Sequence, residues 1–332
     1  MGGYLIRRIL SAVPTLIGVT LVTFLLLELL PGREWALAGA SMGNLTSQET
    51  LARLRETYHL DEPMPRRYVG WLLRFCRWDL GTSLLDGRPV GRILRETAAR
   101  TLALNFLALL LACTVSVPLG IFWAVRAGSP GDRAGSLLLY LLYAFPGFAA
   151  ALLLQQWLAV NLGMLPLQGM RSLSPAAPVW ARGVDLARHL ILPVLCLAYG
   201  SLAYLTRFTR ANVLEGLRSE YITAGRARGL PERVLIWRHA LRNAAVPLLT
   251  LVGVLVPALL GGSVLVETVF SWPGMGRLYF DALQNRDHPV ILGLTALAAL
   301  LTMAGSLLAD LLYCLADPRV DSGQISHGRF FS

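Results

Sequence analysis

The chain has 332 residues, of which 55% are hydrophobic and 15% are charged, and all 30 of its basic residues are arginine. A soluble domain carries more charge, so the composition indicates an integral membrane protein. The net charge of +10 does not indicate nucleic-acid binding, because the arginines fall in loops and beside apolar segments rather than on one basic face.

Six apolar stretches are long enough to cross a bilayer as helices, which takes roughly 20 residues each. They cover residues 9–30, 101–125, 137–162, 189–206, 244–266 and 290–315. Six crossings place both termini on the same side of the membrane. Arginines lie before the first stretch, after the second and after the fourth, so the positive-inside rule predicts that this side is the cytoplasm.

The first stretch is too long for the apolar region of a signal peptide, and no A-x-A cleavage pattern follows it, so we expect it to stay attached. It contains Glu28, three residues before Pro31. A charge at the bilayer centre costs roughly 2.5–3.5 kcal/mol, but this position is near the external interface. We interpret Glu28 as an acid that either has its hydrogen bonds satisfied or snorkels to the interface, with a proton relay as the alternative.

Residues 31–100 form a polar segment that this topology places outside the cell. Within it, Leu51, Leu54 and Tyr58 recur at helical spacing, which predicts an amphipathic helix. Such a helix either docks a partner or covers the external ends of the spans, and the pattern does not separate the two.

Proline and glycine interrupt several of the apolar stretches, at Pro118, Gly120, Pro146, Pro193 and Pro257. Kinks at such positions are tolerated where neighbouring helices supply hydrogen-bond partners. Kinked helices suit a gate around a passage, and they suit ordinary membrane packing equally well.

The polar segment after the fourth stretch, residues 207–244, carries eight arginines and three glutamates, a balance of 8 − 3, or +5. Helical spacing begins at Tyr221 and continues to Arg228. Small residues and one aromatic gather on neighbouring stripes of this helix: Tyr221, Ala224, Gly225, Ala227 and Gly229. Small side chains on an exposed helix allow another protein to approach its backbone, so we interpret the helix as a docking element.

A stop signal follows directly, as Gly229-Leu230-Pro231. Glycine adopts the left-handed conformation that ends helices, and proline is favoured where the next helix opens. The sequence therefore predicts two short helices joined by a tight turn.

With these residues in view, the segment resembles the coupling loop, or EAA-type motif, of binding-protein-dependent ABC importer permeases, in their dipeptide, oligopeptide and nickel branch. The family pattern ARAKGL, then RHALRNA and proline, corresponds to residues 224–230, 238–244 and Pro247. Further matches lie at residues 7–8, 14–15, 30–32, 79–83, 88–90, 267–274 and 316–319. Two positions differ: Gly225 stands where the family more often has alanine, and Ala99 where it usually has proline.

The resemblance implies an all-α membrane protein with six transmembrane helices of the type I ABC importer permease fold and an external amphipathic segment after the first helix. It implies three parts: a transmembrane helix in residues 1–31, an external segment in 32–100, and a core permease domain in 101–332 with five transmembrane helices and the coupling loop 207–244.

The resemblance also implies a set of residues that contact the ATPase. They are Glu220, Tyr221, Ala224, Gly225, Ala227, Gly229, Leu230, Arg238, His239, Arg242 and Asn243. The sequence identifies no substrate-binding, catalytic or metal-binding residues.

The partners implied by the resemblance are two ABC ATPase subunits, a second related permease, an external substrate-binding protein and the lipid bilayer, in a bacterial inner membrane. The chain has no G-x-x-x-x-G-K-[ST] motif, so a P-loop for ATP is absent. We expect ATP and magnesium to be bound by the partner ATPases and no cofactor to be bound by this chain.

Other candidate chemistry is sparse. The four cysteines and five histidines are scattered, without metal-ligand spacing, so we interpret the cysteines as packing residues and assign no metal site. Asp310 and Asp317 share a helix face near the cytoplasmic end of the sixth stretch, and we interpret them as structural acids paired with arginine.

Four functions remain to be compared. An ABC importer permease for di- or oligopeptides is the function that the motifs favour, and a permease for nickel or a metal chelate is the first alternative. The third function is a stand-alone carrier or membrane enzyme that uses Glu28 or Asp310, and the fourth is a structural scaffold. Neither of these two explains the docking helix.

Overall fold

The computed structural model describes residues 2–29, 62–245, 247–248, 251 and 264–316. The regular secondary structure of this part of the chain is helical, apart from one isolated bridge between Thr82 and Pro89. The chain divides into two compact units. Unit 1 comprises residues 1–101, 260–264 and 273–304, and unit 2 comprises residues 102–259, 265–272 and 305–332.

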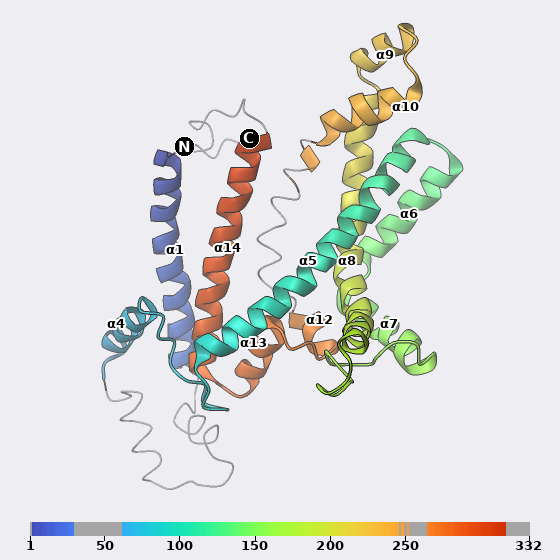
Figure 1. Ribbon diagram of the computed structural model, residues 1–332. Helices are drawn as coiled ribbons and strands as arrows, with labels where there is room; N and C mark the ends of the chain where they lie inside the picture. The colour runs from blue at the N-terminus through green and yellow to red at the C-terminus, as the bar shows by residue number, and fades with distance from the viewer. Residues whose placement is uncertain (1, 30–61, 246, 249–250, 252–263, 317–332) are drawn as a thin grey trace. The chain divides into compact units, whose positions relative to one another are not determined.

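Unit 1 contains α1 (Gly2–Leu29), α4 (Met64–Phe75), the beginning of α5 (Val90–Val125), α13 (Met275–Gln284) and most of α14 (His288–Ala316) (Figure 1). One apolar cluster holds these helices together. It includes Phe24 of α1, Trp71 of α4, Leu94 of α5, Ala282 of α13 and Ile291 of α14. The C-terminal end of α1 therefore lies beside the N-terminal end of α14.

The short helix α4 lies against α1 through a tyrosine. Tyr68 is buried, and its hydroxyl donates to the carbonyl oxygen of Ile17 at 3.0 Å and lies 3.0 Å from the hydroxyl of Thr20. The exposed side of α4 carries arginine and leucine, among them Arg66 and Leu73. The helix is therefore amphipathic, with aromatic residues inward.

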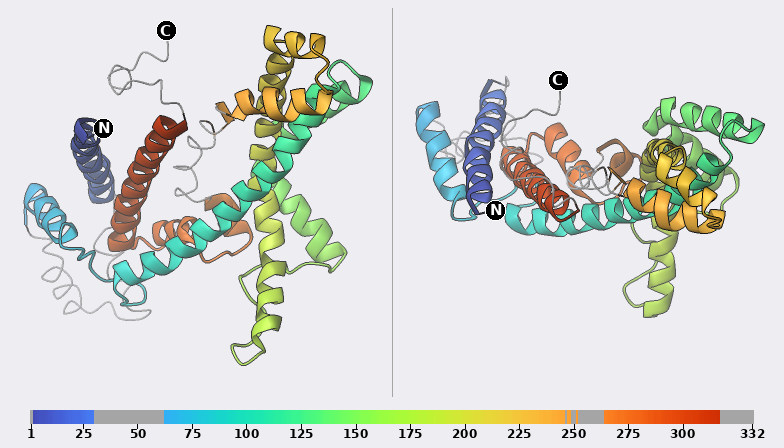
Figure 2. Two further views of the ribbon diagram at one scale, coloured as in Figure 1. Left: turned by 45° about the horizontal axis from the view of Figure 1, so that its top comes forward. Right: turned by 90° about the horizontal axis from the view of Figure 1, so that it is seen from above.

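Unit 2 contains the rest of α5, then α6 (Pro130–Ala144), α7 (Gly147–Leu154), the π-helix η1 (Gln155–Asn161), α8 (Val179–Leu217) and α12 (Val264–Val269). Between α8 and α12 come α9 (Glu220–Ala227), α10 (Glu232–Val234) and the π-helix η2 (Leu235–Ala240). Figures 1 and 2 show α9 and α10 at one end of α8 and α7 toward its other end.

Two glycines allow the helices of unit 2 to approach closely. A Cβ added at Gly120 of α5 would lie 2.6 Å from Cβ of Thr209 and 2.8 Å from the carbonyl oxygen of Thr206, both on α8. A Cβ at Gly135 of α6 would lie 2.5 Å from the ring of Trp123 on α5. Small residues at crossings are the usual means of packing helices in membranes, and here they bring α6 and α8 onto α5.

An ion pair joins α6 to α8. The buried carboxylate of Asp132 accepts hydrogen bonds from Nε and Nη2 of Arg210, each at 2.7 Å, and one from the backbone N–H of Gly128 at 2.9 Å. Ser129 caps α6 by accepting from the N–H of Asp132. The turn between α5 and α6 is thus tied to α8 by charge as well as by packing.

At the opposite end of α8, a buried amide and a buried histidine organise the loop that precedes it. Gln155 donates to the carbonyl oxygen of Leu167 at 2.8 Å. His189 lies 3.2 Å from the hydroxyl of Ser172 through Nε2, and its Nδ1 lies 2.8 Å from the carbonyl oxygen of Asp185. The Asp185 carboxylate also accepts from the N–H of Ser172, so the loop is held by α8.

Among the residues that the structure describes, four helices are long and apolar enough to cross a membrane, at Leu10–Leu29, Val90–Val125, Val179–Leu217 and His288–Leu308. They coincide with the first, second, fourth and sixth predicted stretches. The third stretch differs from the single helix expected, because α6 and α7 with η1 meet at an angle of 97°. Phe145 and Pro146 break the helix with extended backbone, as a residue before proline avoids the helical region.

Several predictions lie outside the described residues. They concern the amphipathic helix containing Leu51, Leu54 and Tyr58, most of the fifth stretch including Pro257, and Asp317 with the closing motif. Asp310 lies in α14, but its side chain is outside the description. The amphipathic helix observed in this region of the chain is α4, which lies later in the sequence.

Candidate coupling loop

The candidate loop is a helical hairpin at the end of α8. Arg218 is the C-cap of α8, Ser219 is the N-cap of α9, and α9 begins at Glu220. The Ser219 side chain donates to the carbonyl oxygen of Gly216 at 2.5 Å instead of capping α9. The chain therefore turns directly from α8 into α9 without an intervening loop.

The turn that ends α9 is a Schellman motif. Gly229 has φ +77°, its N–H donates to the carbonyl oxygen of Arg226 at 2.9 Å, and the N–H of Leu230 donates to that of Gly225 at 3.1 Å. These are the two hydrogen bonds that define this cap. Pro231 then serves as the N-cap of α10, so the predicted stop signal is confirmed.

The hairpin has a small core of its own. Ile222 of α9, Leu235 and Ala240 of η2 are buried together, with Leu217 of α8 packed beside them. An added Cβ at Gly216 would lie 3.5 Å from the backbone of Ala240. The hairpin is therefore folded against the end of α8 by apolar contacts, and this leaves its outer side uncovered.

Gly225 lies inside the hairpin, which differs from the exposed docking position that we expected. It is buried, and a Cβ at this position would lie 2.7 Å from Cδ2 of Leu235 and 3.5 Å from Cδ1 of Leu230. The helical spacing identified a stripe of small residues correctly, but it could not show that one stripe member faces η2. Gly225 is a packing position.

The other predicted residues are distributed as follows. His239 is half-buried in η2, and the exposed residues are Glu220, Tyr221, Ala224, Ala227, Gly229, Leu230, Arg238, Arg242 and Asn243. The outer side of α9 thus presents Tyr221, 42% exposed, with the two alanines. An outer side with small residues beside an aromatic can contact a complementary protein surface closely.

An ion pair spans the turn between α9 and α10. Nε of Arg226 donates to Oε1 of Glu232 at 2.6 Å. This hydrogen bond raises the pKa of Arg226 and lowers the pKa of Glu232. Both side chains are about half exposed, and exposed pairs contribute little to stability, so its effect is to orient the turn.

The second half of the hairpin attaches it to two long helices. Ala244 is buried with Ile121 and Ala124 of α5 and with Val213 of α8. Ile236 of η2 packs against the same cluster. The hairpin, the end of α5 and the end of α8 therefore form one structure at one end of unit 2.

Sequence reasoning missed three residues of this site. Ile222 and Leu235 form its core, and they could have been found as the apolar positions of two otherwise polar helices. Trp237, 58% exposed on η2, is the one tryptophan in residues 207–244. A single tryptophan in a polar loop could have been recognised from the sequence as a candidate contact residue, but our interpretation of this loop followed the motif match alone.

The family described as "Binding-protein-dependent transport system inner membrane component" matches residues 116–322, and its N-terminal companion, "Binding-prot-dependent transport system membrane comp, N-term", matches residues 1–104. The chain belongs to this permease family. The permease is therefore a multi-pass component of an inner membrane, and the predicted fold class, the all-α type I ABC importer permease fold, is confirmed.

Similar proteins align with the permease over nearly their full length. The oligopeptide transport system permease protein AppB of Bacillus subtilis is 37% identical over 97% of this chain and 100% of that protein. The dipeptide transport system permease protein DppB of Escherichia coli K12 is 35% identical, over 96% and 98% respectively. The glutathione transport system permease protein GsiC of Pectobacterium atrosepticum is 35% identical, over 96% and 99%.

Membership of this family establishes which subunit of a transport system the chain is. The permease is the non-enzymatic membrane subunit of a binding-protein-dependent ABC importer, which works with ATPase and substrate-binding partners. ATP is used by the partner ATPases. The predicted resemblance is confirmed, and the stand-alone carrier, the membrane enzyme and the scaffold are no longer needed.

Proposed function

We propose that this permease imports di- or oligopeptides, with two ABC ATPases, a second related permease in a heterodimer and an external peptide-binding protein. The observation that carries the substrate class is the near full-length similarity to permeases named for oligopeptide, dipeptide and glutathione transport. No feature of the described residues favours nickel, which remains the competing outcome of a transport assay.

The proposed topology places both termini in the cytoplasm. In unit 2, the arginine-bearing turn after α5 and the coupling hairpin lie at one end, since Ala124 and Ala244 share a cluster. This supports the same cytoplasmic side for both segments under the positive-inside rule. We also propose that the chain has three parts in sequence order: a first transmembrane helix in residues 1–31, an external segment in residues 32–100 and the core permease domain in residues 101–332.

The proposed mechanism is alternating access driven through the hairpin. The outer side of α9 sits in a groove of the ATPase, and nucleotide-driven closure of the two ATPases moves the hairpin and opens the passage outward. Hydrolysis resets the passage. The apolar attachment of the hairpin to α8 and α5 supports this, because movement of a hairpin with its own core is transmitted to the helices against which it packs.

The first test of docking compares Gly229→Asp with Gly229→Asn. Both residues tolerate positive φ better than other side chains, and a Cβ at this position would meet nothing within 4 Å. The two variants therefore share their backbone strain and differ in charge. Gly229→Asp should insert into the membrane normally but lose ATPase association and peptide uptake, whereas Gly229→Asn should keep both.

A second test addresses the small outer residues. Ala224→Trp adds bulk at an exposed position of α9, and Arg233→Trp places the same large side chain at an exposed position of α10. We expect only Ala224→Trp to abolish co-purification with the ATPase. Normal uptake by Ala224→Trp and Gly229→Asp would refute docking by this face, and ATP-driven uptake of nickel but not of peptides would refute the proposed substrate.

A further inference from the structure

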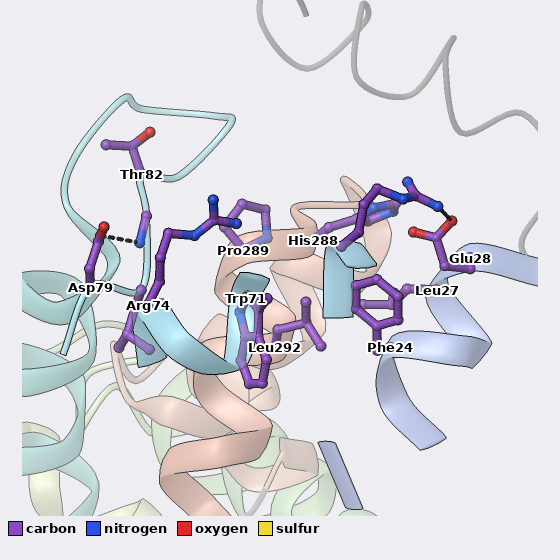
Figure 3. A pocket seen from close by; sticks show the side chains of 13 residues that line it. Phe24, Leu27, Glu28, Trp71, Arg74, Asp79, Thr82, His288, Pro289 and Leu292 are labelled. Carbon is purple, nitrogen blue, oxygen red and sulfur yellow. Dashed lines mark hydrogen bonds and ion pairs between the residues drawn. The ribbon is translucent and has the colours of Figure 1, made fainter. Parts of the chain in front are cut away.

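Unit 1 contains a cavity of about 280 Å³ between α1, α4 and the beginning of α14 (Figure 3). Its walls combine charged and apolar side chains. Glu28 comes from α1, Arg74 and Trp71 from α4, and His288 and Leu292 from α14. The coupling proposal makes no use of this cavity.

The charged part of the wall contains an arginine with spare donors. Nη2 of Arg67 donates to Glu28 at 2.5 Å, the contact drawn as a dashed line at Glu28 in Figure 3. The Arg67 side chain is only 10% exposed, and its Nε and Nη1 are buried without a hydrogen-bond acceptor in the part of the chain that the structure describes. Buried donors left without acceptors are destabilising, more so on a charged group. The described residues therefore leave these two donors of the cavity wall available to an acceptor from a ligand.

The apolar part of the wall is provided by the membrane-spanning helices. Phe24 and Leu27 of α1 and Leu292 of α14 face the cavity together with Trp71, as their labelled side chains in Figure 3 show. Arg74, whose side chain is labelled in Figure 3, adds a second guanidinium to a wall that also includes Pro289 and Asp79. A ligand that fits carries an anionic group beside an apolar body.

The position of the cavity relative to the membrane restricts the class of ligand that can bind in it. Glu28 lies at the end of the 20-residue apolar segment Leu10–Leu29, which is the length that crosses the hydrocarbon core. The adjacent α4 carries arginines and the aromatic residues that are typical of the lipid headgroup region. The two available donors of Arg67 are therefore at the level of lipid phosphates.

We propose that this cavity binds a phospholipid, whose phosphate accepts hydrogen bonds from Arg67 and whose acyl chain covers the wall formed by Phe24, Leu27 and Leu292. Arg74 is a second donor to the headgroup. Glu28 and Asp79 also line the cavity, and Asp79 already accepts from the N–H of Gly81 at 3.1 Å. With two guanidinium groups balanced by two carboxylates, the site suits a zwitterionic headgroup, in which an ammonium group accompanies the phosphate.

The decisive variant is Arg67→Lys. Lysine keeps a positive charge for Glu28, but its three N–H donors all lie on one nitrogen, so it lacks the separate Nε and Nη1 donors of the guanidinium. Arg66→Lys is the matched control, since Arg66 is the preceding residue of α4 and its side chain is 79% exposed. Arg74→Gln tests the second donor.

The assay uses the intact transporter purified in mild detergent, with bound phospholipid measured by mass spectrometry of lipid extracts and by phosphorus content. The wild type and Arg66→Lys should retain a phospholipid that Arg67→Lys loses, and Arg74→Gln should retain less than the wild type. Delipidated wild type should regain it from phosphatidylethanolamine vesicles.

Two results would overturn the proposal. One is equal phospholipid retention by Arg67→Lys and the wild type. The other is binding of a labelled dipeptide or inorganic phosphate to the delipidated wild type that requires Arg67 and that phosphatidylethanolamine does not displace, because the cavity would then serve a soluble ligand. Loss of peptide uptake is not used as a readout, so failure here is distinct from failure of the proposed transport function.

Discussion

Gly229 is the residue whose replacement has the most direct structural consequence for the coupling hairpin. Its φ is +77°, and an added Cβ would meet nothing within 4 Å. Replacement by alanine therefore changes only the backbone energy, by about 1–2 kcal/mol for an L-residue in the left-handed conformation. Asparagine tolerates this conformation better and should change it less.

This strain acts on the two hydrogen bonds that close α9, from the N–H groups of Gly229 and Leu230. An increase of about 1–2 kcal/mol raises the population of the open turn roughly 5- to 30-fold. Hydrogen exchange of the reconstituted transporter measures this directly, since exchange of a locally opening segment follows its opening free energy. In Gly229→Ala, amides of residues 226–230 should exchange faster by that factor.

The control is Gly229→Asn, which should exchange at a rate between those of the wild type and Gly229→Ala. Amides of Leu235 and Ala240 in the hairpin core should remain protected in all three proteins. Wild-type protection in Gly229→Ala would contradict the role assigned to the cap. Equal exchange in the alanine and asparagine variants would also contradict it, because the effect would not then come from backbone strain.

Three further predictions concern packing and charge. Gly120→Ala should destabilise the permease by about 1–3 kcal/mol through overpacking and lower its melting temperature in detergent, whereas Gly200→Ala, where an added Cβ meets nothing within 4 Å, should not. Asp132→Asn should destabilise it by about 2 kcal/mol, below the 3–5 kcal/mol of a fully buried pair, because its arginine partner is 26% exposed; an unchanged melting temperature would contradict this. Glu232→Gln should loosen the α9–α10 turn near neutral pH, as hydrogen exchange would detect. Pairing with Arg226 lowers the Glu232 pKa below its ordinary 4.5. The ordering of the turn by this pair is therefore present above pH 4.5 and is lost as the pH falls through the lowered pKa, so wild type and variant should converge there. A difference that persists in acid would contradict the pairing.

Local patterns of the sequence predicted local structure well. The order Gly229-Leu230-Pro231 predicted a helix stop followed by a new helix, because the conformational preferences of glycine and proline are properties of single residues. The apolar stretches predicted the long helices α1, α5, α8 and α14 for the same reason, since length and hydropathy are local.

Orientation and long-range pairing were not predictable in this way. Gly225 and Ala224 are neighbours of similar size, and only the position of Leu235 decides which of them is buried. The acid at Glu28 predicted a partner but not its identity, because Arg67 is 39 residues away along the chain. The sequence therefore predicted the helices, but it did not predict the contacts between residues that lie far apart along the chain.

The continuity of α8 has a mechanical consequence. The helix runs for 39 residues, about 58 Å at 1.5 Å per residue, from the loop held by His189 to the hairpin. A tilt of about 5° around one end moves the other end of such a rod by about 5 Å. A displacement of side-chain dimensions at the hairpin therefore requires only a small tilt of α8 about its far end. Pro193, inside the helix, is where α8 would bend instead of tilting as a rigid unit.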